Sequence, residues 1–210
     1  LFKAPPWTGL LRTSTDFCDP LHLNYIHRVG SDAGPGLSPG DIVLSLRNIS
    51  RFAILDGQTW TLKRVVAGSF VHQHAVHHVA GSRFVMFDNM GGSPAGPATR
   101  ILEVDVETGQ ERLIFPNETI PDEFQDLFSE TAGNLHLSAD RSRLLASFTE
   151  EGLAFEIDYP TGKLLASYRH LHDLSQLNRT PEGEPSAALF RIFTLRYVDT
   201  DKTLLEAKKQ

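Results

Sequence analysis

Apolar residues along this 210-residue chain occur in short runs separated by turn-forming residues. The clearest run is Phe84–Phe87, which is closed by Asp88, Asn89 and two glycines and is typical of a buried strand that enters a turn. A helical spacing of apolar residues appears only at 121–128. The pattern therefore predicts an all-β chain.

One unit of this pattern occurs three times. Each copy contains an apolar segment that ends in Asp, a turn that contains Thr, and a second β-rich segment. The turn threonines are Thr59, Thr108 and Thr161. They lie roughly 50 residues apart, which is close to the period of β-propeller blades. We therefore predict a β-propeller built from four-stranded antiparallel blades.

The predicted blades cover 19–66, 70–115 and 130–168, with flanking pieces at 1–18 and 187–210. In each blade the first strand begins at His22, at His74 or within Asn134–His136. The second covers Asp41–Arg47, Arg83–Phe87 or Arg143–Phe148, the third ends at the Asp before the turn, and the fourth covers Thr61–Val66, Gln110–Phe115 or Lys163–Tyr168. Because repeat units bury their faces only against neighbours, three blades do not close a ring. Residues 1–210 are thus expected to form one partial propeller domain.

Histidines stand at the expected beginnings of the innermost strands. Blades packed around an axis place these strands on the central channel, so His22, His74 and His136 are expected to meet at one mouth of it. Neighbouring antiparallel strands run in opposite directions, which brings His22 towards Arg47 and His74 towards Asn89. Convergence from three repeats is the main argument for a functional site.

Composition limits the partners. With 26 acidic and 20 basic residues the net charge is -6, and no Lys/Arg cluster is present, so we expect no nucleic-acid partner. Cys18 is the only cysteine, which excludes an intrachain disulfide. No apolar run approaches the roughly 20 residues needed to cross a bilayer, so no membrane span is expected.

Four of the nine histidines, His72, His74, His77 and His78, lie within one short segment. A metal-free imidazole site is the favoured interpretation. His72 and His74 are two residues apart and would share a strand face, so a metal-dependent hydrolase or lactonase stays open as an alternative, as does an incidental surface cluster. Arg47 has forked donors that suit an oxyanion.

Four short motifs resemble those of the bacterial arylsulfate sulfotransferase family and occur in the same order. They are Asp19-Pro-Leu-His22-Leu-Asn24, Ser45-Leu-Arg47, Gln73-His74 and Phe87-Asp88-Asn89, and the resemblance covers about 19–168. The resemblance implies a six-bladed propeller that is periplasmic or secreted. It also implies transfer of a sulfuryl group from a phenolic sulfate ester to a phenol through a sulfohistidine, with no nucleotide donor or other cofactor, and it allows a homodimer.

The resemblance further implies roles for individual residues. His136 is expected to be the nucleophile, and His74 and His22 are expected to bind sulfate and transfer protons. Arg47 or Arg100 is expected to hold the charge of the sulfuryl group, because the family's arginine after Asp-Asn-Gly is replaced here by Gly91, Gly92 and Ser93. The expected substrate-binding residues are Asn24, Asn89, Asp88 and Gln73, and no metal ligand is expected. A propeller that binds a ligand or a protein without turnover is the remaining alternative.

Overall fold

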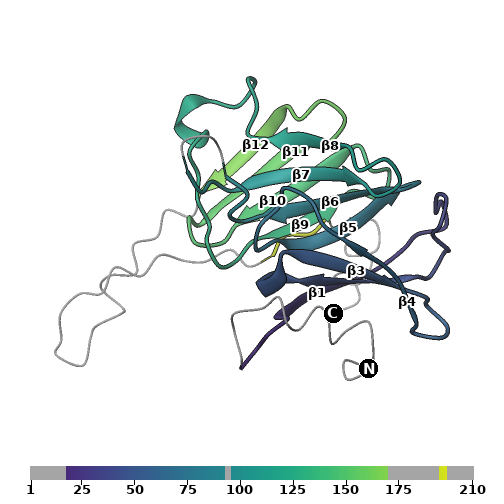
Figure 1. Cartoon of the computed structure of the whole chain (residues 1–210). Helices are drawn as coiled ribbons and strands as arrows, with labels where there is room; N and C mark the ends of the chain where they lie inside the picture. Colours follow the sequence, from purple (N-terminus) through teal and green to yellow (C-terminus); the bar gives the residue numbers. More distant parts are fainter. Residues whose placement is uncertain (1–17, 93–95, 170–193, 198–210) are drawn as a thin grey trace, which may run out of the picture.

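A computed structural model describes residues 18–92, 96–169 and 194–197, and these form three four-stranded antiparallel sheets (Figure 1). The first sheet contains β1 (Leu23–Arg28), β2 (Ile42–Leu46), β3 (Arg51–Leu55) and β4 (Leu62–Val66). The second contains β5 (His74–Ala80), β6 (Arg83–Asp88), β7 (Arg100–Asp105) and β8 (Glu111–Phe115). The third contains β9 (Asn134–Leu137), β10 (Arg143–Phe148), β11 (Leu153–Asp158) and β12 (Leu164–Arg169). In each sheet, strands that follow one another in the chain are neighbours.

The predicted all-β class is confirmed, and the predicted strands agree with the observed ones to within a few residues. The helical spacing at 121–128 produces only the 3₁₀ turn η2 (Asp122–Phe124); a second such turn, η1 (Arg47–Ile49), follows β2. The flanking piece expected at 187–210 lies outside the described residues except for 194–197, which have no regular secondary structure. The flanking piece expected at 1–18 lies outside them except for Cys18.

The repeated Asp-to-Thr turns join the third strand of each sheet to the fourth. In the first sheet, the Asp56 carboxylate accepts hydrogen bonds from the backbone N–H groups of Gln58 and Thr59, at 3.0 and 2.8 Å, and from the Thr59 hydroxyl at 2.9 Å. In the equivalent turns, Asp105 accepts the N–H groups of Glu107 and Thr108, and Asp158 accepts the N–H and the hydroxyl of Thr161. The carboxylate thus satisfies backbone donors that no strand partner reaches, which is why the motif recurs.

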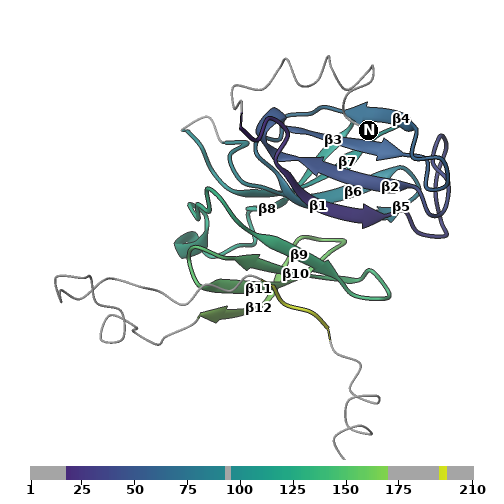
Figure 2. The same ribbon diagram turned by 90° about the horizontal axis from the view of Figure 1, so that it is seen from below.

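The second sheet is buried on both faces because it packs against each of the other two. Figure 2 shows the third sheet below the first and second sheets, which overlap in this view. Successive side chains on a strand point to opposite faces. On β6, Phe84 and Met86 pack into the core shared with the first sheet, while Val85 and Phe87 pack into the core shared with the third. The continuous apolar run that predicted a buried strand therefore supplies two cores.

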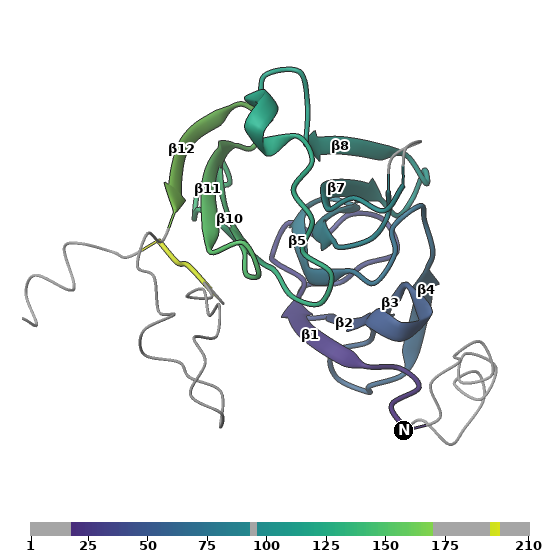
Figure 3. The same cartoon turned by 90° about the vertical axis from the view of Figure 1, so that its left-hand side faces the viewer.

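The first strands of the three sheets lie next to one another. β1 contacts β5, and β5 contacts β9. Figure 3 shows β4, β8 and β12 towards the outside and β1 and β5 towards the middle. The polar residues at the beginnings of the first strands are therefore brought together. Within the described segments, no helix has the length and apolar character to cross a membrane.

Candidate active site

His74 is the first residue of β5, and a neighbouring amide orients its ring. Nδ1 of His74 lies 2.8 Å from Oδ1 of Asn89, the residue that follows β6. The Nδ2 group of Asn89 donates to the backbone carbonyls of Ser129 and Ala132, at 2.7 and 3.0 Å. Because these carbonyls can only accept, the amide oxygen must face the histidine, and His74 must carry its proton on Nδ1. The lone pair of the neutral ring is then on Nε2.

Burial lowers the pKa of His74, and the charges of Arg47 and His22 act in the same direction. The hydrogen bond to Asn89 opposes this shift. The imidazole is therefore neutral at pH 7, the state in which a histidine can act as a nucleophile or a base.

Gln73, which precedes His74, connects the first two sheets. Its backbone carbonyl accepts hydrogen bonds from the Asn24 amide at 2.8 Å and from the Ser45 hydroxyl at 3.2 Å. Its side-chain amide donates to the Ser45 hydroxyl at 3.2 Å and to the Arg51 carbonyl at 2.7 Å. The Gln73 side chain is fully buried. These bonds fix the backbone next to the reactive histidine.

Asp88 fixes the same loop from the other side. Its buried carboxylate accepts backbone N–H bonds from Val71 at 2.8 Å and from Gly91 at 3.0 Å. Nε and a terminal nitrogen of Arg100 reach the second oxygen at 2.8 and 2.6 Å. Burial raises the pKa of Asp88, and the Val71 N–H and the Arg100 charge oppose that rise. Arg100 is thus occupied by Asp88, and it also donates to the Ser69 carbonyl.

Gly91 makes room for this ion pair. A Cβ at position 91 would collide with both the Asp88 carboxylate and the Arg100 guanidinium. This steric requirement explains why a glycine occupies position 91, close to the place where an arginine was expected from the resemblance.

His22 and Arg47 are close enough to His74 for their charges to lower its pKa. His22 precedes β1, and its Nδ1 forms a 2.7 Å contact with the Asp19 carboxylate. The His22 carbonyl accepts the backbone N–H of Arg47 at 3.1 Å. The charges of both residues also lower the pKa of His72, after the larger effect of burial. The charge of Glu130 opposes this effect on His72.

His136 lies at a different level from His74. On the second strands of the three sheets, Val43, Val85 and Leu145 occupy equivalent positions, and they pair with His27, His77 and His136. His74 is instead equivalent to Tyr25 and Asn134, because these pair with the next matching set, Ser45, Phe87 and Ser147. The expectation that His22, His74 and His136 share one repeat position is therefore wrong. Irregular pairing in β1 and β5 shifts the register in a way that the sequence spacing does not reveal.

The deeper level contains neutral histidines. The rings of His27 and His77 are 4.7 Å apart, and burial lowers the pKa of His27 to about 4 and that of His77 to about 3. The Tyr25 hydroxyl lies at hydrogen-bond distance, 2.9 Å, from Nε2 of His77, and a backbone hydrogen bond at Leu135 opposes the fall in the pKa of His77. His136 has a buried Nδ1 with no hydrogen-bond partner among the described residues. Sequence reasoning missed this Tyr25–His77 pair.

A pocket of about 310 Å³ lies at the beginnings of the first strands. It is lined by Asn24, Tyr25, His74, Ala75, Ala132, Gly133, Asn134, Thr149 and Thr194. All three sheets and the 194–197 segment thus contribute to it. Of the residues predicted from sequence, His74 and Asn24 line this pocket directly.

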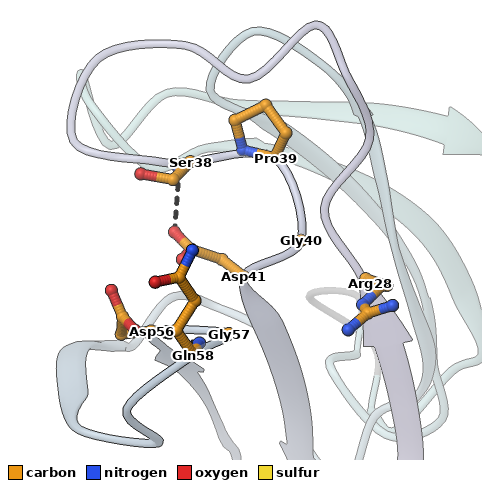
Figure 4. A pocket seen from close by; sticks show the side chains of 8 residues that line it. All are labelled: Arg28, Ser38, Pro39, Gly40, Asp41, Asp56, Gly57 and Gln58. Carbon is orange, nitrogen blue, oxygen red and sulfur yellow. Dashed lines mark hydrogen bonds between the residues drawn. The ribbon is translucent and has the colours of Figure 1, made fainter.

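A second pocket lies at the β1–β2 and β3–β4 connections (Figure 4). Its lining includes Arg28, Asp41 and Gln58, and the Ser38 N–H donates to Asp41 at 2.8 Å. None of the predicted site residues lines it. Of these two pockets, only the first is lined by residues predicted from the sequence.

The metal alternative needs His72 and His74 on one strand face. His72 instead precedes β5 with a positive φ of 55°, and its Nδ1 lies 3.1 Å from the Met90 sulfur. Across 18–92, 96–169 and 194–197, no three His, Cys, Asp or Glu side chains are grouped as a metal site requires. The geometry thus gives no support to the hydrolase or lactonase alternative.

Comparison with known proteins identifies a family for this chain. A family model described as Arylsulfotransferase (ASST) matches residues 2–172. No curated protein matches the chain.

Proposed function

The chain belongs to the arylsulfotransferase family, and we propose that its pocket transfers a sulfuryl group from a phenolic sulfate ester to a phenol through His74. One observation carries the choice of residue: Asn89 holds the Nδ1 proton of His74 and leaves the Nε2 lone pair available. His136, the nucleophile expected from the sequence, lacks such a partner in the described part of the chain. We therefore assign the nucleophile to His74.

In the first half-reaction, Nε2 of His74 forms a bond to sulfur as the bond between sulfur and the aryl oxygen breaks. The aryl oxygen leaves with the electron pair and takes a proton from His22, which the Asp19 carboxylate supports. The imidazole ring becomes cationic, and its hydrogen bond to the Asn89 oxygen strengthens as this charge develops. No nucleotide or metal ion takes part in these steps.

The second half-reaction reverses the first. The acceptor phenol gives its proton to His22, its oxygen bonds to sulfur, and the electron pair of the N–S bond returns to His74. The transferred group spreads negative charge over three oxygens, so a cation placed beforehand lowers the barrier. Arg47 has this role, since its charge already acts on His74. Loss of one such donor typically costs about 3 kcal/mol of transition-state stabilisation.

We propose supporting roles for three residues that the sequence suggested as substrate ligands or a charge clamp. Gln73 and Asp88 are fully buried and hydrogen-bonded to their neighbours. Arg100 pairs with Asp88. All three hold the loop that leads into β5, and thereby the position of His74. Asn24 lines the pocket and is the better candidate for substrate contact.

We further propose that the three sheets are blades of a six-bladed propeller and that the protein acts in the periplasm or outside the cell. The meander order of each sheet and the contacts between successive first strands support the propeller. Membership of the family supports the location and the phenolic substrates.

Trapping the intermediate tests the proposal. Wild-type protein is incubated with an aryl sulfate without acceptor, quenched, and digested for mass spectrometry, and transfer is measured after a phenol is added. We expect a sulfo group on His74, no adduct and no transfer in His74→Gln, and an adduct that persists in His136→Gln. An adduct on His136, or no adduct in the wild-type protein, would contradict the assignment.

A binding protein without turnover is the second candidate. The pairing of Arg100 with Asp88 favours it, because this arginine is no longer available to the substrate. Saturable binding of an aryl sulfate by a wild-type protein that shows no exchange would support this candidate over the transferase.

A further inference from the structure

We propose that Arg196 supplies a second positive charge to the pocket, on the side of Tyr25 and His136, and binds the sulfonate oxygens of the substrate. The inference rests on the proposed function, because it concerns the anionic group that this function requires. It adds a residue from the flanking piece at 187–210, where the sequence indicated no site residue.

The segment 194–197 is placed against the pocket by both of its ends. Thr194 lines the pocket together with His74. The Tyr197 hydroxyl donates to Glu156 on β11 at 3.1 Å, and the Tyr197 ring lies 5.9 Å from the ring of His136. Arg196 therefore lies between a residue of the pocket wall and a residue that packs beside His136.

The direction of Arg196 follows from the pattern of exposure. Thr194 and Arg196 are exposed, whereas Leu195 and Tyr197 are half-buried. Such alternation is typical of an extended segment, in which residues two apart share a side. Because Thr194 faces the pocket, Arg196 extends on that side as well.

The charge of Arg196 acts on Tyr25, which lines the pocket, and on His136, which lies outside that lining. It lowers the pKa of His136 on β9, after the larger effect of burial. It also opposes the rise that burial causes in the pKa of Tyr25 on β1. Arg196 is therefore close enough to act on a ligand held between these strands.

The groups around Arg196 cannot replace its positive charge. His27 and His77 are neutral, and the Tyr25 hydroxyl is hydrogen-bonded to Nε2 of His77. Arg100 is held by Asp88. No acidic side chain within the described segments forms an ion pair with Arg196, so its guanidinium keeps its donors for a ligand. A planar guanidinium matches the oxygens of a sulfonate, and two cations on different sides would hold that group in one orientation.

The test measures binding, so that it does not depend on turnover. The probe is 4-methylbenzenesulfonate, whose carbon–sulfur bond prevents transfer, and its affinity is measured by calorimetry at low and at moderate salt. The variants are Arg196→Gln and Arg196→Lys, with Arg169→Gln as the matched control, since Arg169 is an exposed arginine at the end of β12. We expect an affinity loss of about tenfold or more and a weaker salt dependence for Arg196→Gln.

Arg196→Lys should recover part of the affinity, and Arg169→Gln should bind as the wild type does. Equal affinity for the wild type and Arg196→Gln would overturn the inference, and so would an equal loss in the Arg169→Gln control. A wild-type protein that forms no sulfohistidine, but binds the probe through Arg196, would contradict the proposed transfer and still support the anion site.

Discussion

The two ends of each sheet use their polar residues differently. At the outer turns, the Asp56 carboxylate bonds to residues two and three positions further along the chain. At the pocket end, Gln73 is linked to Ser45 and Asn24, residues 28 and 49 positions away, and Asn89 is linked to Ser129, 40 positions away. The first set of bonds closes a turn, whereas the second holds separate sheets together.

Bonds within a turn and bonds between sheets should therefore matter differently for stability and for activity. A turn bond involves only its own hairpin, so its loss is felt by that hairpin alone. A bond between sheets positions a side chain relative to others that come from distant parts of the sequence. Because sulfuryl transfer depends on the relative placement of such side chains, substitutions at the pocket end should have the larger effects.

The largest effect is expected from Asn89→Leu. Without the amide oxygen, His74 no longer has a fixed proton on Nδ1, and its Nε2 no longer carries the lone pair in every molecule. We expect kcat for sulfuryl transfer to fall by about 100-fold, as misplaced reactive groups typically cause. Pre-steady-state formation of sulfohistidine measures this step directly.

Thr99→Val provides the control for that variant. The Thr99 hydroxyl donates to the Asn89 carbonyl at 3.1 Å and accepts the Ser129 N–H at 2.7 Å, so its loss loosens the same loop without touching His74. It should lower the melting temperature and leave kcat within a few-fold of the wild type. An equal fall in kcat in both variants would show that loop rigidity, and not the proton position on His74, controls the reaction.

The contrast between the two ends also explains what the sequence could predict. The strands and the three turns follow from local patterns, namely the alternation of apolar residues and an Asp three residues before a Thr. The importance of His74 and its neighbour Asn89 could be inferred as well, since both lie in short motifs. Their partners Ser129 and Ala132 belong to another repeat and carry no local signal.

Register was the main obstacle to predicting the rest. The irregular pairing in β1 and β5 places His136 level with His77 and not with His74, and it does so through backbone geometry. Ala75, at the irregular point of β5, has a positive φ of 50°, which an alanine seldom adopts, so the residue type gave no warning. Arg196 was missed because its segment meets the pocket through tertiary contacts alone.

A smaller effect, on stability, is expected from Gln73→Leu. The substitution removes the bonds to the Ser45 hydroxyl and the Arg51 carbonyl. The Arg51 carbonyl loses this partner, whereas the Ser45 hydroxyl keeps its bond to the backbone carbonyl of residue 73. We expect the free energy of unfolding to fall by about 2 kcal/mol, measured by urea denaturation. Gln58→Leu, an exposed glutamine in the first outer turn, is the control and should change it by less than about 0.5 kcal/mol. A similar loss in both variants would remove the distinction between the two ends.

The smallest effect is expected from Thr59→Val at the first outer turn. The hydroxyl donates to Asp56 at 2.9 Å and lies 2.9 Å from the Thr61 hydroxyl, but both contacts are exposed to water, which replaces them when they are lost. The Thr59 N–H bond to Asp56 does not depend on the side chain. The melting temperature should therefore fall by no more than about 3 °C, as followed by circular dichroism, with sulfuryl transfer unchanged.

Thr108 and Thr161 lie in the other two sheets, far from this turn in the sequence, so replacing all three threonines should lower the melting temperature by the sum of the single effects. A loss well beyond that sum would mean that the outer turns are coupled through the sheets, and that the turns as well as the pocket hold the three sheets in place.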